Sequence, residues 1–168
     1  MPTSTYIPLQ TITLGSSASS VTFASIPQTY RDLVLVSNVM QVANTNHRMG
    51  VNGDTALNYS FVQMFGDGTG SGTSNSGSSL DYFTPFINNN PSTSTTDLGI
   101  TVFMDYSATD KHKTMLMTNS SNATIVFPMV ARSAARWAST AAIISIICYP
   151  VSGNLATGTT FSLYGIEA

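Results

Sequence analysis

Charged residues are scarce in this chain of 168 residues. Six Lys and Arg and eight Asp and Glu make up 8% of the sequence, with a net charge of −2, whereas a soluble domain usually carries about 25% charged residues. Nucleic-acid binders need clustered cations to neutralise phosphates, and anionic membrane surfaces attract the same feature. We therefore expect neither nucleic acid nor a membrane surface as a partner.

Cysteine is nearly absent, and long apolar runs are missing. Cys148 is the one cysteine, and its place in the apolar run IISIICY indicates a small buried hydrophobe, not a nucleophile. The longest apolar stretch, AAIISIICYPV from Ala141, is too short for a membrane span of about 20 residues. The start, MPTSTYIPLQ, lacks the basic and apolar regions of a signal peptide, so we expect synthesis in a cytoplasm.

Hydrophobic residues still make up 42% of the chain, and they occur in short segments rich in β-branched and aromatic residues. Turn formers such as Asn52-Gly53-Asp54 and Ser152-Gly153-Asn154 separate these segments. The pattern predicts one all-β domain over residues 1–168, a jelly-roll-like antiparallel β-sandwich of about eight to ten strands. The expected strands lie in TYIPLQTITL, SVTF, DLVLVSNV, HRMGVN, SFVQMF, DYFTPFI, LGITVFMDY, KHKTMLMT, ATIVFPMV, AAIISIICY and TTFSLYGI.

Three stretches do not read as strands. ARSAARWASTAA, from Ala131, has helical propensity, but Ser139-Thr140 interrupts it and no capping pattern frames it, so we expect no helix. Gly66–Ser79 and Asn88–Asp97 lack apolar residues that could drive packing, and both are predicted to be long loops. A loop of this kind is either a surface loop, which a partner can order, or a binding site, and the sequence leaves both open.

The densest group of charges is MDYSATDKHKTM, residues 104–115. The flanking segments alternate like strands, and Ser107 to Asp110 form a turn-length gap, so this group is predicted to be the solvated corner of a hairpin. In that arrangement Asp105 and Lys113 can face each other across the strand pair.

A catalytic interpretation of this corner is less well supported. An Asp–His dyad would use Asp110 or Asp105 to orient His112 as a base for a serine. Successive residues of a strand point to opposite faces, so Asp110 is poorly placed for that role if the strand begins there. No G-x-S-x-G motif offers a nucleophile.

A two-carboxylate glycosidase would have to rely on Asp residues that look like turn residues, since Glu167 is the one Glu. The sequence therefore predicts no catalytic residue.

No metal or cofactor site is predicted either. His47 and His112 lie far apart in the sequence, and no calcium-loop pattern occurs. Asp67 in Phe65-Gly66-Asp67-Gly68 could join a cation site through backbone carbonyls, but a simple turn explains the same residues. The glycine-rich stretch lacks a phosphate-binding pattern.

Four residues are candidates for contact with a glycan or a protein partner. Trp137, beside Arg136, is either a ring that stacks on a sugar or a core anchor, and its Ala-rich surroundings favour the core. Asp67 and Asn75 in the first predicted loop and Asn89 in the second could supply polar contacts to the same ligand.

Several stretches together resemble a family of small virion proteins of marine and cyanobacterial tailed phages. The resemblance covers nearly the whole chain, except that Gly68 to Ile100 differs in its loops and composition. It implies a phage structural protein of head or tail without catalytic residues. The residues that carry it are Thr5–Val36, Asn52-Gly53-Asp54-Thr55, Asn58-Tyr59-Ser60, Phe65-Gly66-Asp67-Gly68, MDYSATDKHKT, Arg136-Trp137 and Gly158–Ile166.

Two functions are compatible with these observations. The first is a capsid decoration or cement subunit on the major capsid protein, because a neutral, hydroxyl-rich surface packs without desolvating charge. A homotrimer is expected because threefold symmetry is typical of such parts. The second is a tail-fibre or tail-tip module that recognises a host surface glycan through its long loops. In both cases the expected location is the virion, after synthesis in the host cytoplasm.

Overall fold

The computed structural model describes residues 4–43, 45–66, 70, 72–86, 93, 95–121 and 129–167. Within these ranges the chain forms twelve strands and no helix, which confirms the predicted all-β class. None of the described segments is therefore a helix that could cross a membrane. The strands are β1 (Tyr6–Thr13), β2 (Val21–Phe23), β3 (Asp32–Val39), β4 (His47–Val51), β5 (Tyr59–Gly66), β6 (Gly72–Leu80), β7 (Phe83–Phe86), β8 (Asp97–Met104), β9 (Lys113–Ser121), β10 (Met129–Trp137), β11 (Ile146–Pro150) and β12 (Thr160–Ile166).

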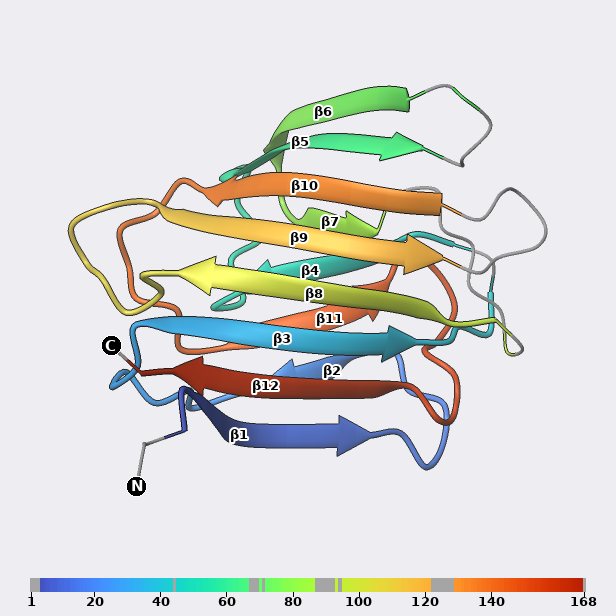
Figure 1. The fold of residues 1–168 in the computed structure, drawn as a ribbon, viewed down its shortest axis with the longest axis horizontal. Coiled ribbons are helices and arrows are strands. Elements are labelled where there is room, and N and C mark those ends of the chain that lie inside the picture. Colours follow the sequence, from blue (N-terminus) through green and yellow to red (C-terminus); the bar gives the residue numbers. More distant parts are fainter. Residues whose placement is uncertain are drawn as a thin grey trace.

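The strands form two antiparallel sheets that pack face to face (Figure 1). The larger sheet has eight strands in the order β1-β12-β3-β8-β9-β10-β5-β6, and the smaller has four in the order β2-β11-β4-β7. Without the β5–β6 and β9–β10 pairs, the remaining order is β1-β12-β3-β8 against β2-β11-β4-β7. Consecutive strands then alternate between the sheets, except that β4 and β7 both lie in the smaller one, as in a jelly roll. The two extra pairs extend one sheet only, so one side of the sandwich is much wider than the other.

The hydrophobic core lies between the sheets. Buried and exposed residues alternate strictly along β9 and almost as regularly along β8 and β10, because successive side chains of a strand point to opposite faces. The inward-facing residues that fill the core include Leu33, Phe103, Met115 and Phe161, each fully buried. The core therefore fixes which face of the large sheet remains open.

The stretch Gly66–Ser79 is not a long loop, and this prediction was wrong. Residues 72–80 form β6, which pairs with β5 as an edge strand in register from Gly66–Gly72 to Tyr59–Leu80, with one bulge. Its Gly, Ser and Asn residues have low strand propensity, but backbone hydrogen bonds to β5 are enough where little burial is required. Gly77 is also sterically useful, because a Cβ there would lie 2.8 Å from the Phe61 ring.

The Ala-rich segment from Ala131 forms a strand, in agreement with the expectation that it is not a helix. Met129, Ala131, Ser133, Ala135 and Trp137 are all buried, and the residues between them are more exposed. Small side chains at alternate positions allow β10 to lie in the middle of the sheet, between β9 and β5. The strand expected at ATIVFPMV overlaps β10 only at Met129 and Val130, since residues 122–128 lie outside the described residues.

The second predicted loop, Asn88–Asp97, falls largely outside the described residues. Asp97 itself begins β8, and its side chain is buried.

Candidate interaction surface

Trp137 is a core residue with a polar anchor. Its side chain is buried, and its Nε1 donates a hydrogen bond of 2.6 Å to Oδ2 of Asp54. Asp54 also accepts from Nδ2 of Asn58 at 2.9 Å and from the backbone N–H of Ala56 at 2.8 Å. Although desolvation raises the pKa of Asp54, these hydrogen bonds outweigh it and lower the pKa. The Trp137 ring is thus enclosed and unavailable to stack on a sugar.

The other candidate contact residues do not gather around Trp137. Asn75 is exposed on β6, where its Oδ1 accepts the backbone N–H of Ser76 at 2.8 Å. In the strand register it aligns with Gln63, whereas Trp137 aligns with Tyr59 four residues away on β5. Asp67 and Asn89 lie outside the described residues. No shared binding site is formed by the two residues that the structure describes.

The charged segment connects β8 to β9 and is a hairpin corner, as predicted. Asp105 does not face Lys113, however, so that part of the prediction was wrong. Asp105 pairs instead with Nζ of Lys111 at 3.2 Å, with both side chains about half exposed. Lys113 points inward, and its Nζ donates to the carbonyl oxygens of Lys111 at 2.9 Å and Thr140 at 3.2 Å. Lys113 is the first residue of β9, and its side chain lies on the core side of the strand. Its ammonium group therefore stabilises the corner through hydrogen bonds on the inner side.

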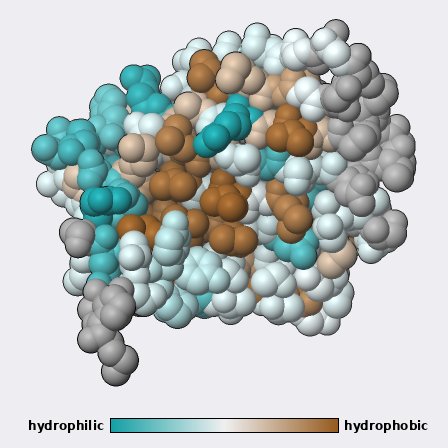
Figure 2. Space-filling view, in the orientation of Figure 1, coloured by the Kyte–Doolittle hydropathy of each residue, from teal (hydrophilic) through white to brown (hydrophobic). Residues whose placement is uncertain are grey.

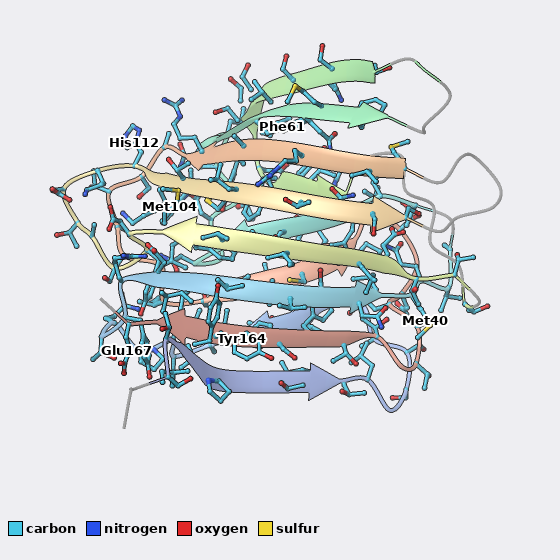
Figure 3. The ribbon with its side chains drawn as sticks, viewed as in Figure 1. Met40, Phe61, Met104, His112, Tyr164 and Glu167 are labelled. Carbon is cyan, nitrogen blue, oxygen red and sulfur yellow. The ribbon has the colours of Figure 1, made fainter. Side chains whose placement is uncertain are left out.

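His112 is exposed at this corner, close to Met104 at the end of β8 (Figure 3). Among the described residues, no hydrogen bond or ion pair links its ring to Asp105 or Asp110. The geometry therefore supplies no oriented Asp–His pair at this position.

The buried titratable groups have environments that suppress their charge. Burial raises the pKa of the Cys148 thiol, which lies in the core as predicted. His47 is buried in the core side of β4, where desolvation lowers its pKa to about 3 and its ring stacks on Phe161 at 5.8 Å between centroids. Within the described ranges, no three His, Cys, Asp or Glu residues come together as a metal site.

The most distinctive surface is the open side of the eight-stranded sheet, which we call the outer face. Figure 2 shows apolar residues gathered in the centre of this side, over β8, β9, β10 and β5, with paler hydroxyl residues around them. Each of the large apolar side chains that form the patch has 38% to 68% of its surface exposed. They are Val36, Val62, Met64, Leu98, Ile100, Met104, Leu116 and Val130.

Strand register makes these residues contiguous. Val62 on β5 aligns with Ala134 on β10, which aligns with Leu116 on β9, which aligns with Val102 on β8. This row continues to β3 and to Tyr164 of β12, which Figure 3 shows lower on the sheet. An apolar band thus crosses six neighbouring strands from β5 to β12, so the patch is one surface and not a set of isolated side chains.

The outer face is shallowly hollowed. One open groove of about 710 Å³ runs between Val62, Met64, Leu116 and Arg132, and another of about 320 Å³ lies by Val36, Ile100 and Val130. Aliphatic side chains and hydroxyl groups form much of both walls, and Gln63, Asn75 and Arg132 also line the larger groove. Such walls suit contact with another surface.

The sequence analysis missed this face. The available signal was that several outward positions in DLVLVSNV, SFVQMF and LGITVFMDY are apolar as well as the inward ones, as is Leu116 in KHKTMLMT. Strands that are apolar on both sides are typical of sheets covered on both sides.

Comparison of the chain with family models, with curated proteins and with solved structures finds no match. The function must therefore be argued from the fold and from the outer face.

Proposed function

We propose that this chain is a non-enzymatic structural subunit of a bacteriophage virion, a capsid decoration or cement protein that assembles as a homotrimer on the major capsid protein. The observation that carries the proposal is the outer face: a broad apolar sheet surface on a chain with few charges. Soluble monomers rarely expose a contiguous apolar patch of this kind, whereas subunits of assemblies bury one on contact.

Other features of the molecule support a structural role. The jelly-roll topology is widely used in capsid proteins, and the resemblance of several stretches to small phage virion proteins agrees with it. The buried Cys148 and His47 and the exposed, unoriented His112 favour a protein without catalysis.

The receptor-binding alternative has lost part of its support. That interpretation relied on Trp137 as a sugar-stacking ring and on two long loops, Gly66–Ser79 and Asn88–Asp97, the second of which falls largely outside the described residues. Trp137 is enclosed by its contact with Asp54, and most of the glycine-rich segment is β6. No observation on the described residues favours a glycan site over an assembly surface.

Protein composition of purified virions tests the proposal. Virions of the encoding phage would be banded by density and analysed by quantitative mass spectrometry against the major capsid protein. A decoration subunit should be present in a copy number similar to that of the capsid protein. A few copies per particle would indicate a tail component instead, and absence from the particle would reject the virion role.

A further inference from the structure

We infer that the outer face is the surface through which copies of this chain contact one another, with the neighbouring copies of a trimer covering the apolar patch. This inference rests on the proposed function and assigns its subunit contact. It concerns the exposed faces of β5, β10, β9, β8 and β3, where the patch lies.

The size of the face agrees with a subunit interface. The whole face, with the apolar patch and the polar residues around it, has eight strands. They span seven spacings of about 4.8 Å, and eight residues rise about 3.3 Å each, which gives an area of about 900 Å². Each partner in a standard stable interface buries about 800 Å². The whole face, shared between the two neighbours of a trimer, thus offers each copy about the area of a standard interface.

The shape of the face also favours a second copy. A twisted, pleated sheet packs well against another sheet, at about 10 Å and with the strands within about 30° of alignment. The chain uses this geometry between its own two layers. Another copy of the same protein offers a second sheet surface of the same twist and the same apolar character.

The charges on the face are arranged for contact between unlike halves. Arg132 and Arg136 are exposed on β10, and neither guanidinium has an ion-pair partner among the described residues. Asp32 lies three strands away on β3, at the same height along the sheet as Arg136. The strand register shows this. Arg136 aligns with Thr114 on β9, which aligns with Met104 on β8. Leu33 aligns with Phe103 in an antiparallel pair, so Asp32 lies level with Met104. The Asp32 carboxylate already pairs with Arg31 Nε at 2.8 Å and accepts the backbone N–H of Asp105 at 2.9 Å, so Arg136 of another copy would join an existing ion pair.

Any rotation about an axis parallel to the strands preserves height and brings the β10 half of one copy to the β3 half of the next, so Arg136 approaches Asp32. A rotation of one third of a turn closes such contacts into the ring of three copies that the proposed function requires. Packing of identical halves would instead place Arg132 and Arg136 against their own copies, where two buried like charges repel.

Measurement of mass in solution tests the inference. Purified wild-type chain at micromolar concentration, studied by size exclusion with light scattering, should have three times the monomer mass of 17.8 kDa. Val62→Glu and Leu116→Glu place a carboxylate on the patch and should raise the dissociation constant at least tenfold. Leu57→Glu is the matched control, because Leu57 is 68% exposed in the turn before β5 and lies off the sheet.

A check that each variant is folded distinguishes loss of subunit contact from loss of the fold. Each variant would be compared by circular dichroism melting, and Met64→Ser, a milder change on the same face, would replace a glutamate variant that does not fold. A monomeric wild type, or a trimer equally stable in the face variants, would overturn the inference. If the wild type is monomeric yet abundant in virions, this inference and the homotrimer fail, and the virion role stands. If it is trimeric through this face yet absent from virions, only the proposed function fails.

Discussion

Trp137 and Asp54 are 83 residues apart in the sequence and are joined by a hydrogen bond of 2.6 Å between indole Nε1 and carboxylate Oδ2. The contact ties the end of β10 to the turn that follows β4. The same turn is held from the other side, because the side-chain amide of Asn52 donates to the Ala142 carbonyl at 2.7 Å and accepts from the Ile144 backbone N–H at 2.8 Å. The Asn52–Asp54 turn therefore links both sheets through side chains.

The first prediction concerns this link. Trp137→Phe and Asp54→Ala should each lower the free energy of unfolding by about 1–3 kcal/mol, since a hydrogen bond to a charged group is lost. The double variant should cost less than the sum of the two, because both remove one interaction. Urea unfolding of the four proteins measures this. Additive losses would mean that the contact contributes no coupling.

The same carboxylate gives a pH dependence. Because the folded-state pKa of Asp54 is lowered, its contribution is present above the unfolded pKa of about 3.9 and is lost as the pH falls through the folded value. The difference in stability between wild type and Asp54→Ala should therefore shrink in acid.

The second prediction compares two lysines of the hairpin corner. Lys113→Met should destabilise the protein by about 1–3 kcal/mol, because it removes the donor to the Lys111 and Thr140 carbonyls. Lys111→Met is the control, since its ion pair with Asp105 is solvent-exposed and should contribute nothing measurable. Thermal melts of both variants check this. An equal effect of the two changes would contradict an inward role for Lys113.

The hairpin corner shows what sequence reasoning can and cannot reach. Turn residues between two alternating segments predicted the connection of β8 to β9, because both signals are local. The partner of Lys113 depends on Thr140, which a separate part of the chain delivers. The contact of Trp137 with Asp54 could not be predicted from the sequence either, because the two residues lie in separate parts of the chain. The core location of the Trp137 ring was predicted.

Two strands illustrate how tertiary context overrides local preference. β6 is built from Gly, Ser, Thr and Asn, and it is a strand because β5 offers an unpaired edge. β10 is rich in Ala, and its neighbours on both sides determine its conformation. The apolar character of the outer face was visible in the sequence, but which of the two apolar sides faces solvent depends on the sheet order.

The third prediction concerns Asp97, which is buried at the start of β8. Burial raises its pKa to about 6, although a hydrogen bond with Ser121 opposes this shift. The folded state therefore binds the proton more tightly than the unfolded chain does, and this group's contribution to stability falls as the pH rises from about 4 to about 6.

Asp97→Asn should remove that loss. The variant should be more stable than wild type at pH 7 by up to about 3 kcal/mol, with the advantage disappearing near pH 4. Urea unfolding of both proteins at the two pH values measures this. A variant that is less stable at pH 7 would show that the Asp97 carboxylate is favourably solvated in the fold.

The fourth prediction concerns Gly165 in β12. A Cβ at this position would overlap ring atoms of Tyr30, since Cγ and both Cδ atoms lie against it. Gly165→Ala should lower stability by about 1–3 kcal/mol through overpacking. Gly15→Ala is the matched control, because nothing lies within 4 Å of a Cβ there. Comparable melting temperatures for the two variants would show that Tyr30 moves aside freely.

Electron microscopy of immunogold-labelled virions tests the central claim most directly. Antibody raised against the purified chain would be applied to intact particles of the encoding phage, with particles of an unrelated phage as the control. The proposed role predicts dense label over the heads. Label confined to the tail or its tip, or no label on the particle, would contradict a capsid decoration subunit.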